Sequence, residues 1–158
     1  MNILVLTISY CLIMFLIMII QRAKPAEFLF LYPEEIRKTY CAEMSEPSLK
    51  RITLNGIFYK TVITVLFITS NMLFIKAPET TDDFLSAFMQ SYILWIIPSF
   101  FKNIIFGCLW FCNDRGFILK NTEHMTKLYK DRSFFILRFI RLSVSGMILS
   151  VGFAFLAG

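Results

Sequence analysis

Residues 3–20 read ILVLTISYCLIMFLIMII and contain no charged side chain. A helix that crosses the hydrocarbon core of a bilayer needs about 20 predominantly apolar residues, so this segment is predicted to span a membrane. It lacks the preceding basic region and the following small-residue cleavage site that mark a secretory signal peptide. We therefore expect a retained membrane helix.

Three further apolar segments extend this pattern, over residues 57–75, 84–112 and 134–157. The composition agrees, because 57% of the 158 residues are hydrophobic and only 17% are charged, whereas soluble domains have about 25% charged residues. The mean hydropathy is +0.66. The sequence predicts an all-α polytopic membrane protein, a single membrane domain with four transmembrane helices, and excludes a disulfide-rich secreted domain.

Lysine and arginine are distributed unevenly among the connecting segments. Residues 21–56 carry six and residues 113–133 carry five, whereas residues 77–83 carry none. Basic loops remain in the cytoplasm, so we expect both long loops inside and both termini outside a cell membrane. Basic residues beside spans attract anionic headgroups. The net charge of +5 therefore indicates membrane lipids as partners, and no nucleic acid.

Both basic loops carry signals of short interfacial helices. Pro33 is followed by two glutamates, which favours a helix start, and we expect a helix over about residues 33–44. Pro47 should then break the chain before a helix from about Ser48 runs into the second span. In the other loop, the pattern predicts a helix over residues 123–132.

Lys102 is the most informative charged residue, because it interrupts the third apolar segment. If the span covers residues 92–111, Lys102 and Asn103 lie in mid-membrane, where a charge usually has a partner or lines a polar cavity. If it covers residues 84–104, Lys102 only reaches the inner headgroups. The pair is therefore a candidate for a ligand site or a transport path.

The last apolar segment carries two further patterns. Arg138 and Arg141 lie three residues apart on one predicted face, where they either reach lipid phosphates or form a pocket for a phosphate-bearing ligand. Small residues also recur every fourth position, which lets helices approach closely. This stripe packs either inside the chain's own bundle or against a second copy or another subunit. Its members are Gly146, Ser150, Ala154 and Gly158.

Other site chemistry has weaker support. Cys108 and Cys112 could join Cys41 or His124 around a metal, but zinc sites usually show closer cysteine pairs or more histidines. We therefore expect free apolar thiols, with no metal and no other cofactor. A cytosolic acid–base set is the alternative to solvated loop residues, and its members would be Asp114, Glu123 and His124.

Two stretches of the basic loops have a distinctive pattern. They are Tyr32-Pro33-Glu34-Glu35-Ile36 and Ile118-Leu119-Lys120-Asn121-Thr122-Glu123-His124-Met125, the latter followed by Tyr129-Lys130-Asp131 and Phe134. This pattern resembles small multi-pass membrane proteins of Gram-positive bacteria, in which an acidic residue is more usual at the position of His124. The resemblance implies a four-span protein of the bacterial inner membrane. Some members carry a permease label, which would imply transport, and no activity is established for the family.

Three hypotheses of function follow. The leading one is a non-enzymatic, transporter-associated or regulatory component that acts through helix packing and its cytosolic face, as a homo-oligomer or with a second membrane subunit. The second is a small oligomeric channel or carrier that uses Lys102. The third is a membrane enzyme for a lipid or prenyl substrate, with the acid–base set and Arg115 at a cytosolic site and the two arginines of the fourth span holding phosphate.

Overall fold

The structure is a computed structural model that describes residues 3–42, 46–75 and 83–157. These residues form helices and no strands. Four helical segments are long and apolar enough to cross a membrane, which confirms the predicted all-α fold with four membrane-span-like helices. They are α1 (Ile3–Ala23), α3 (Glu46–Ile75), α4 (Phe84–Phe100) continued by η2 (Phe101–Phe111), and α6 (Arg132–Ala157).

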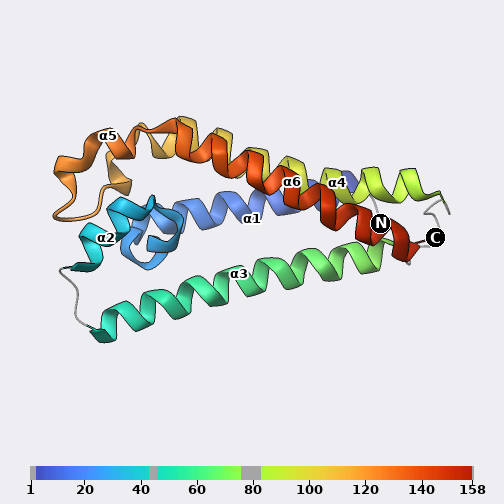
Figure 1. Cartoon of the computed structure of the whole chain (residues 1–158), viewed down its shortest axis with the longest axis horizontal. Coiled ribbons are helices and arrows are strands. Elements are labelled where there is room, and N and C mark those ends of the chain that lie inside the picture. Colours follow the sequence, from blue (N-terminus) through green and yellow to red (C-terminus); the bar gives the residue numbers. More distant parts are fainter. Residues whose placement is uncertain (1–2, 43–45, 76–82, 158) are drawn as a thin grey trace.

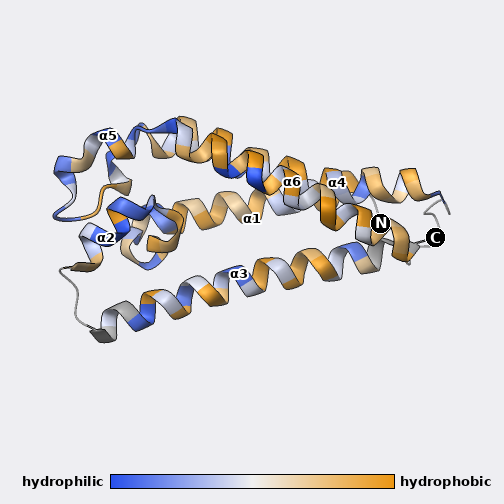
Figure 2. Cartoon of the chain, in the orientation of Figure 1, coloured by the Kyte–Doolittle hydropathy of each residue, from blue (hydrophilic) through white to orange (hydrophobic). Residues whose placement is uncertain are grey.

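The four segments run lengthwise beside one another (Figure 1). Helix α1 begins and α6 ends at the same end of the molecule, whereas α2 (Glu34–Ala42) and α5 (Thr126–Tyr129) lie at the other end. We name this second end the loop end. Hydrophilic residues gather there, and apolar residues prevail along the long helices (Figure 2). Polar and apolar residues are therefore distributed as expected for a bundle of four membrane-spanning helices.

Helices α4 and α6 approach each other closely at Gly146. A Cβ atom on Gly146 would come within 1.9 Å of Cδ1 of Trp95, and the indole N–H of Trp95 donates to the carbonyl of Leu142 at 2.6 Å. Ser150 and Ala154 follow on the same face of α6 and are fully buried. The small-residue stripe thus packs inside this chain's own bundle. Its fourth predicted member, Gly158, lies outside the described residues.

Helix α3 is the least buried of the four spans. Only 11% of the residues in its apolar stretch are buried, against 22–33% in the other three spans. Near the loop end it packs on η1 (Pro25–Leu31), where the ring of Phe30 lies 5.2 Å from that of Tyr59. Further along, the ring of Phe67 meets that of Trp95 edge to face at 4.6 Å. Aromatic contacts therefore join helix α3 to the bundle at separate levels.

An aromatic core joins the two basic loops at the loop end. Tyr32 donates its hydroxyl to the carbonyl of Phe117 at 2.9 Å, and burial raises the pKa of this phenol, so it remains a donor. The ring of Tyr32 also meets those of Phe111 and Tyr129 edge to face. The two basic loops thus form one packed unit and do not extend separately along the membrane surface.

Two local predictions about the loops need correction, and one short helix was missed. The helix expected over residues 123–132 is interrupted, because Asp131 accepts a hydrogen bond from the amide of Ser133 at 2.9 Å and so begins a new helix, α6. Pro47 lies in the first turn of α3, where proline is tolerated, and so does not break the chain. The short helix η1 was not foreseen. Its fold depends on contacts with α3, which is distant in sequence.

Candidate functional site

A cavity of about 340 Å³ lies between α1, α3, α4 and α6. We name it the central cavity. Its size is within the roughly 300–1,000 Å³ of ordinary ligand sites. Most of its wall is apolar and includes Ile63 and Phe67 of α3, Leu94 and Trp95 of α4, and Leu142 of α6. The bundle therefore encloses room for a small or elongated molecule beside α3.

Three cations line the part of the central cavity nearer the loop end, and they are Lys60, Lys102 and Arg138. Lys102 donates Nζ to the Tyr59 hydroxyl at 3.1 Å, and the same atom lies 5.1 Å from the centre of the Tyr59 ring. Arg138 donates Nη1 to the carbonyl of Leu31 at 3.3 Å. These contacts fix both side chains at the cavity without neutralising their charge.

The described residues provide no counter-charge at this place. Their ion pairs join Arg22 to Asp114, Lys38 to Glu34, and Arg51 to Glu27. None of these pairs includes Lys102 or Arg138, and no described residue that lines the cavity is acidic. An uncompensated charge away from water is costly. A bound anion would therefore supply the counter-charge that these buried basic side chains lack.

The cations lie well inside the apolar part of the bundle. Arg138 is six residues along α6 from Arg132, and Lys60 is ten residues along α3 from Lys50, where the span begins. At 1.5 Å per residue these positions are roughly 9 and 15 Å from the loop end of their spans, in a hydrocarbon core about 30 Å thick. Lys102 also lines the cavity and lies nine residues before Phe111, where its helical segment ends.

The helix that carries Lys102 changes type at this level. Pro98 has no N–H to donate to the preceding turn, and from Phe101 to Phe111 the helix is of the π type, which is frequent at functional sites. Asn103 is buried, and its amide donates to the carbonyl of Ser99 at 2.8 Å. Asn103 thus supports the backbone beside Lys102 and does not line the central cavity.

The two arginines of α6 separate. Arg138 lines the central cavity, whereas Arg141 is exposed on the outside of the bundle. Positions three apart differ by roughly 60° around a helix axis. Because α6 lies at the edge of the cavity, this difference is enough to direct the two side chains to different surroundings. The two arginines are thus neighbours by spacing but have different surroundings.

The structure places only some residues of the predicted acid–base set in one pocket. Asp114, Arg115 and Glu123 line a pocket of about 510 Å³ at the loop end, whereas His124 is exposed and does not line it. Without the histidine, this group lacks the residue most often used for proton transfer near neutral pH.

Asp114 is engaged in structural contacts. Its carboxylate accepts hydrogen bonds from Nε of Arg22 at 2.6 Å, from Nε1 of Trp110 at 2.9 Å, and from the amide of Gly116 at 2.8 Å. These donors, Arg22 first, lower the pKa of Asp114 to about 2. The residue therefore joins the end of α1 to the turn that follows η2.

Replacing Asp114 with asparagine should weaken this junction by about 1–3 kcal/mol near pH 7, because bonds to a charged acceptor are lost. A lowered pKa stabilises the fold fully above the ordinary value of about 3.9. This contribution should disappear as pH falls from 4 towards 2. Unfolding of the wild type and the variant, measured across this range, should therefore converge in acid. Glu123→Gln removes the same charge from the same pocket and should have little effect; a similar loss there would contradict the assignment.

The two predicted metal candidates remain free thiols. Cys108 and Cys112 are buried, and burial, aided by the neighbouring Cys108, raises the pKa of Cys112 to about 11. Metal ligation needs the thiolate. Over the described ranges, no group of three His, Cys, Asp or Glu residues is arranged to hold a metal.

Sequence reasoning missed two partners of the cations, Tyr59 and the carbonyl of Leu31. Tyr59 directly precedes Lys60, the charged residue that interrupts the second apolar segment. This position could have marked Tyr59 as a candidate partner. The role of the Leu31 carbonyl has no sequence signal, because it depends on the path of η1.

Comparison of the chain with protein-family models, curated proteins and solved structures finds no match. The resemblance of the loops to membrane proteins of Gram-positive bacteria remains a prediction.

Proposed function

We propose that this chain is a multi-pass membrane protein that binds an anionic ligand in the central cavity. The observation that supports this function is the pair Lys102 and Arg138, both lining the cavity with no carboxylate among its described lining residues. Tyr59 and the Leu31 carbonyl hold the two side chains in place. Such preorganisation reduces the entropy lost on binding. The excess of basic residues at the loop end supports placing that end in the cytoplasm.

The side chains at the cavity favour binding over chemistry. The described lining has no His, Cys, Asp or Glu to act as nucleophile or general base. Lysine and arginine are donors that suit phosphate and carboxylate groups. These donors support the role of a non-enzymatic binding component, such as a regulatory subunit or a small carrier.

The function is tested with inorganic phosphate on the full chain in neutral detergent. Lys102→Met and Arg138→Met should each weaken phosphate binding about 10- to 100-fold, since each removes charge-assisted hydrogen bonds worth about 1.5–3 kcal/mol. Calorimetry at constant ionic strength would measure the dissociation constants.

The matched control is Arg141→Met, which removes the same charge from the exposed side of the same helix. It should bind phosphate as the wild type does. The proposal fails if the wild type does not bind phosphate, or if the control loses as much affinity as Arg138→Met.

A further inference from the structure

The central cavity is polar at one end and apolar at the other. Lys60, Lys102 and Arg138 lie towards the loop end, and the opposite part of the wall includes Phe67 and Trp95. Lys60 and Phe67 are seven residues apart on α3, which is roughly 10 Å along the helix. A ligand with a negative group at the cations can therefore extend an apolar portion of this length towards the middle of the membrane.

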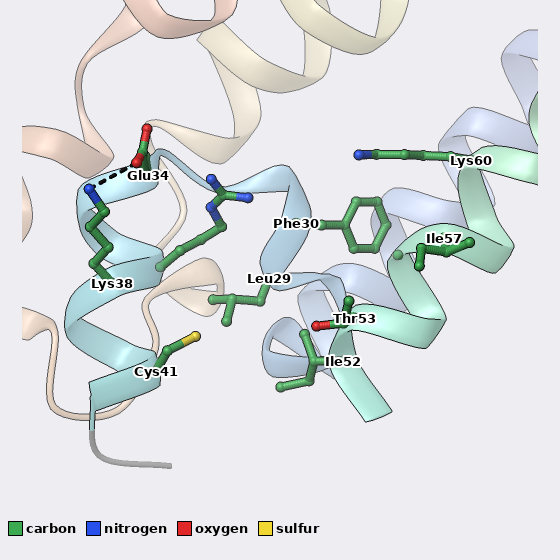
Figure 3. A pocket seen from close by; sticks show the side chains of 11 residues that line it. Leu29, Phe30, Glu34, Lys38, Cys41, Ile52, Thr53, Ile57 and Lys60 are labelled. Atoms are coloured by element: carbon green, nitrogen blue, oxygen red, sulfur yellow. Dashed lines mark ion pairs between the residues drawn. The ribbon is translucent and has the colours of Figure 1, made fainter. Parts of the chain in front are cut away.

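A second pocket, of about 400 Å³, lies at the loop end (Figure 3). Phe30 and Lys60 line both pockets and so mark their boundary. Figure 3 shows Lys60 extending from α3 past Phe30 towards the space between α3 and α2. The two pockets thus lie in series along one side of α3.

The loop-end pocket is also rich in cations. Arg37 and Lys38 of α2 line it together with Lys60. Lys38 is paired with Glu34 at 2.9 Å, whereas Nε of Arg37 is buried without a hydrogen-bond partner in the described structure. Arg37 is also close enough to Arg138 for their charges to repel. Positive charge therefore continues from the loop end to the central cavity.

The helix beside both pockets is the one least embedded in the bundle. Few residues of the α3 span are buried, and this span supplies Ile63 and Phe67 to the wall of the central cavity. A molecule already dissolved in the bilayer can reach such a site from the side. An apolar tail would add contacts with Ile63 and Phe67 that an inorganic anion cannot make.

We infer that the ligand is an anionic phospholipid from the leaflet at the loop end. Its phosphate lies among Lys60, Lys102 and Arg138, one acyl chain follows α3 towards Phe67, and the rest of the headgroup occupies the loop-end pocket. This inference rests on the proposed function and adds the class of ligand. Phosphate is the recognised group, and a free phosphate ion from water is its other source.

The two sources are distinguished with phosphatidylglycerol that carries brominated acyl chains, because bromine quenches a nearby tryptophan. The chain has two tryptophans, so Trp110→Phe leaves Trp95, which lines the central cavity. Brominated phosphatidylglycerol should quench Trp95 at concentrations at least 10-fold lower than brominated phosphatidylcholine, which has no net charge.

Two variants separate the charged end of the site from its apolar end. In the Trp110→Phe background, Lys102→Met should lose the preference for phosphatidylglycerol over phosphatidylcholine and should also weaken the binding of inorganic phosphate. Lys102→Arg should retain the lipid preference and the phosphate binding. Ile63→Phe narrows the apolar end, so it should weaken quenching by phosphatidylglycerol at least 10-fold, which is a larger loss than it causes in phosphate binding. Val65→Phe adds the same ring to the exposed side of α3 and should change neither.

The outcomes test the anion site and the phospholipid ligand separately. If phosphate binding depends on Lys102 but the two lipids quench alike, or Ile63→Phe has no effect, the lipid is overturned and the anion site stands. If neither phosphate nor lipid binding depends on Lys102, both proposals fail.

Discussion

Replacing Gly146 with alanine is expected to lower the free energy of unfolding by about 1–3 kcal/mol, because overpacking costs about 1–3, a lost hydrogen bond adds about 1, and the better helix propensity of alanine offsets about 1. The new Cβ would lie 1.9 Å from Cδ1 and 2.4 Å from Nε1 of Trp95. The indole would have to move, and its bond to the Leu142 carbonyl would break. Thermal unfolding in detergent, followed by circular dichroism, measures the loss.

Gly152→Ala is the matched control, because it makes the same change on the same helix. No atom lies within 4 Å of the Cβ that it would add. Alanine is a better helix former than glycine by about 1 kcal/mol, so this variant should be as stable as the wild type or slightly more stable. Equal destabilisation by the two substitutions would show that Trp95 does not contact Gly146 as described.

The second large effect is expected from Phe117→Ala at the loop end. Phe117 is fully buried, and its ring lies 5.0 Å from that of Phe111 and 5.8 Å from that of Trp110. Deleting a buried phenylalanine costs about 3–5 kcal/mol. Amide hydrogen exchange in the two basic loops should therefore accelerate by roughly 100-fold or more, while exchange in the middle of α4 and α6 stays slow.

Leu109→Ala on η2 provides the comparison, because this leucine is 55% exposed on the outside of the bundle. Its removal should change exchange at the loop end by less than about threefold, since exposed sites usually contribute within 0.5 kcal/mol. If both variants accelerate exchange equally, or if only one basic loop responds to Phe117→Ala, the two loops are not joined through the aromatic core.

The extent of the four spans was predictable because membrane helices are specified by uninterrupted apolar length. The residues at which the spans begin and end were less predictable. The fourth was expected from residue 134 and begins at Arg132, where Asp131 caps it. The helix η1 was not predictable, since its seven residues are too short for a periodic pattern and are held by rings of α3.

The candidate site was predictable to the extent that charge stands out in an apolar segment. Lys102 and Arg138 were singled out in this way, and the structure places both at the central cavity. The exclusion of Arg141 depends on the rotation of α6 about its axis, which sequence spacing does not determine. The role of Gly146 likewise depends on Trp95, which lies 51 positions earlier in the chain.

The contact between Lys102 and Tyr59 also matters for the biosynthesis of the protein. A lysine at mid-membrane costs about 2.5–3.5 kcal/mol on insertion, and α3 precedes α4 in the chain. If the proposed membrane helices insert in chain order, Tyr59 is already in the bilayer when Lys102 leaves water, and it offers a hydroxyl and an aromatic face. Arg138 arrives last and meets a site that is already positive. A bound anion would remove this repulsion, so the ligand would also assist the final step of assembly.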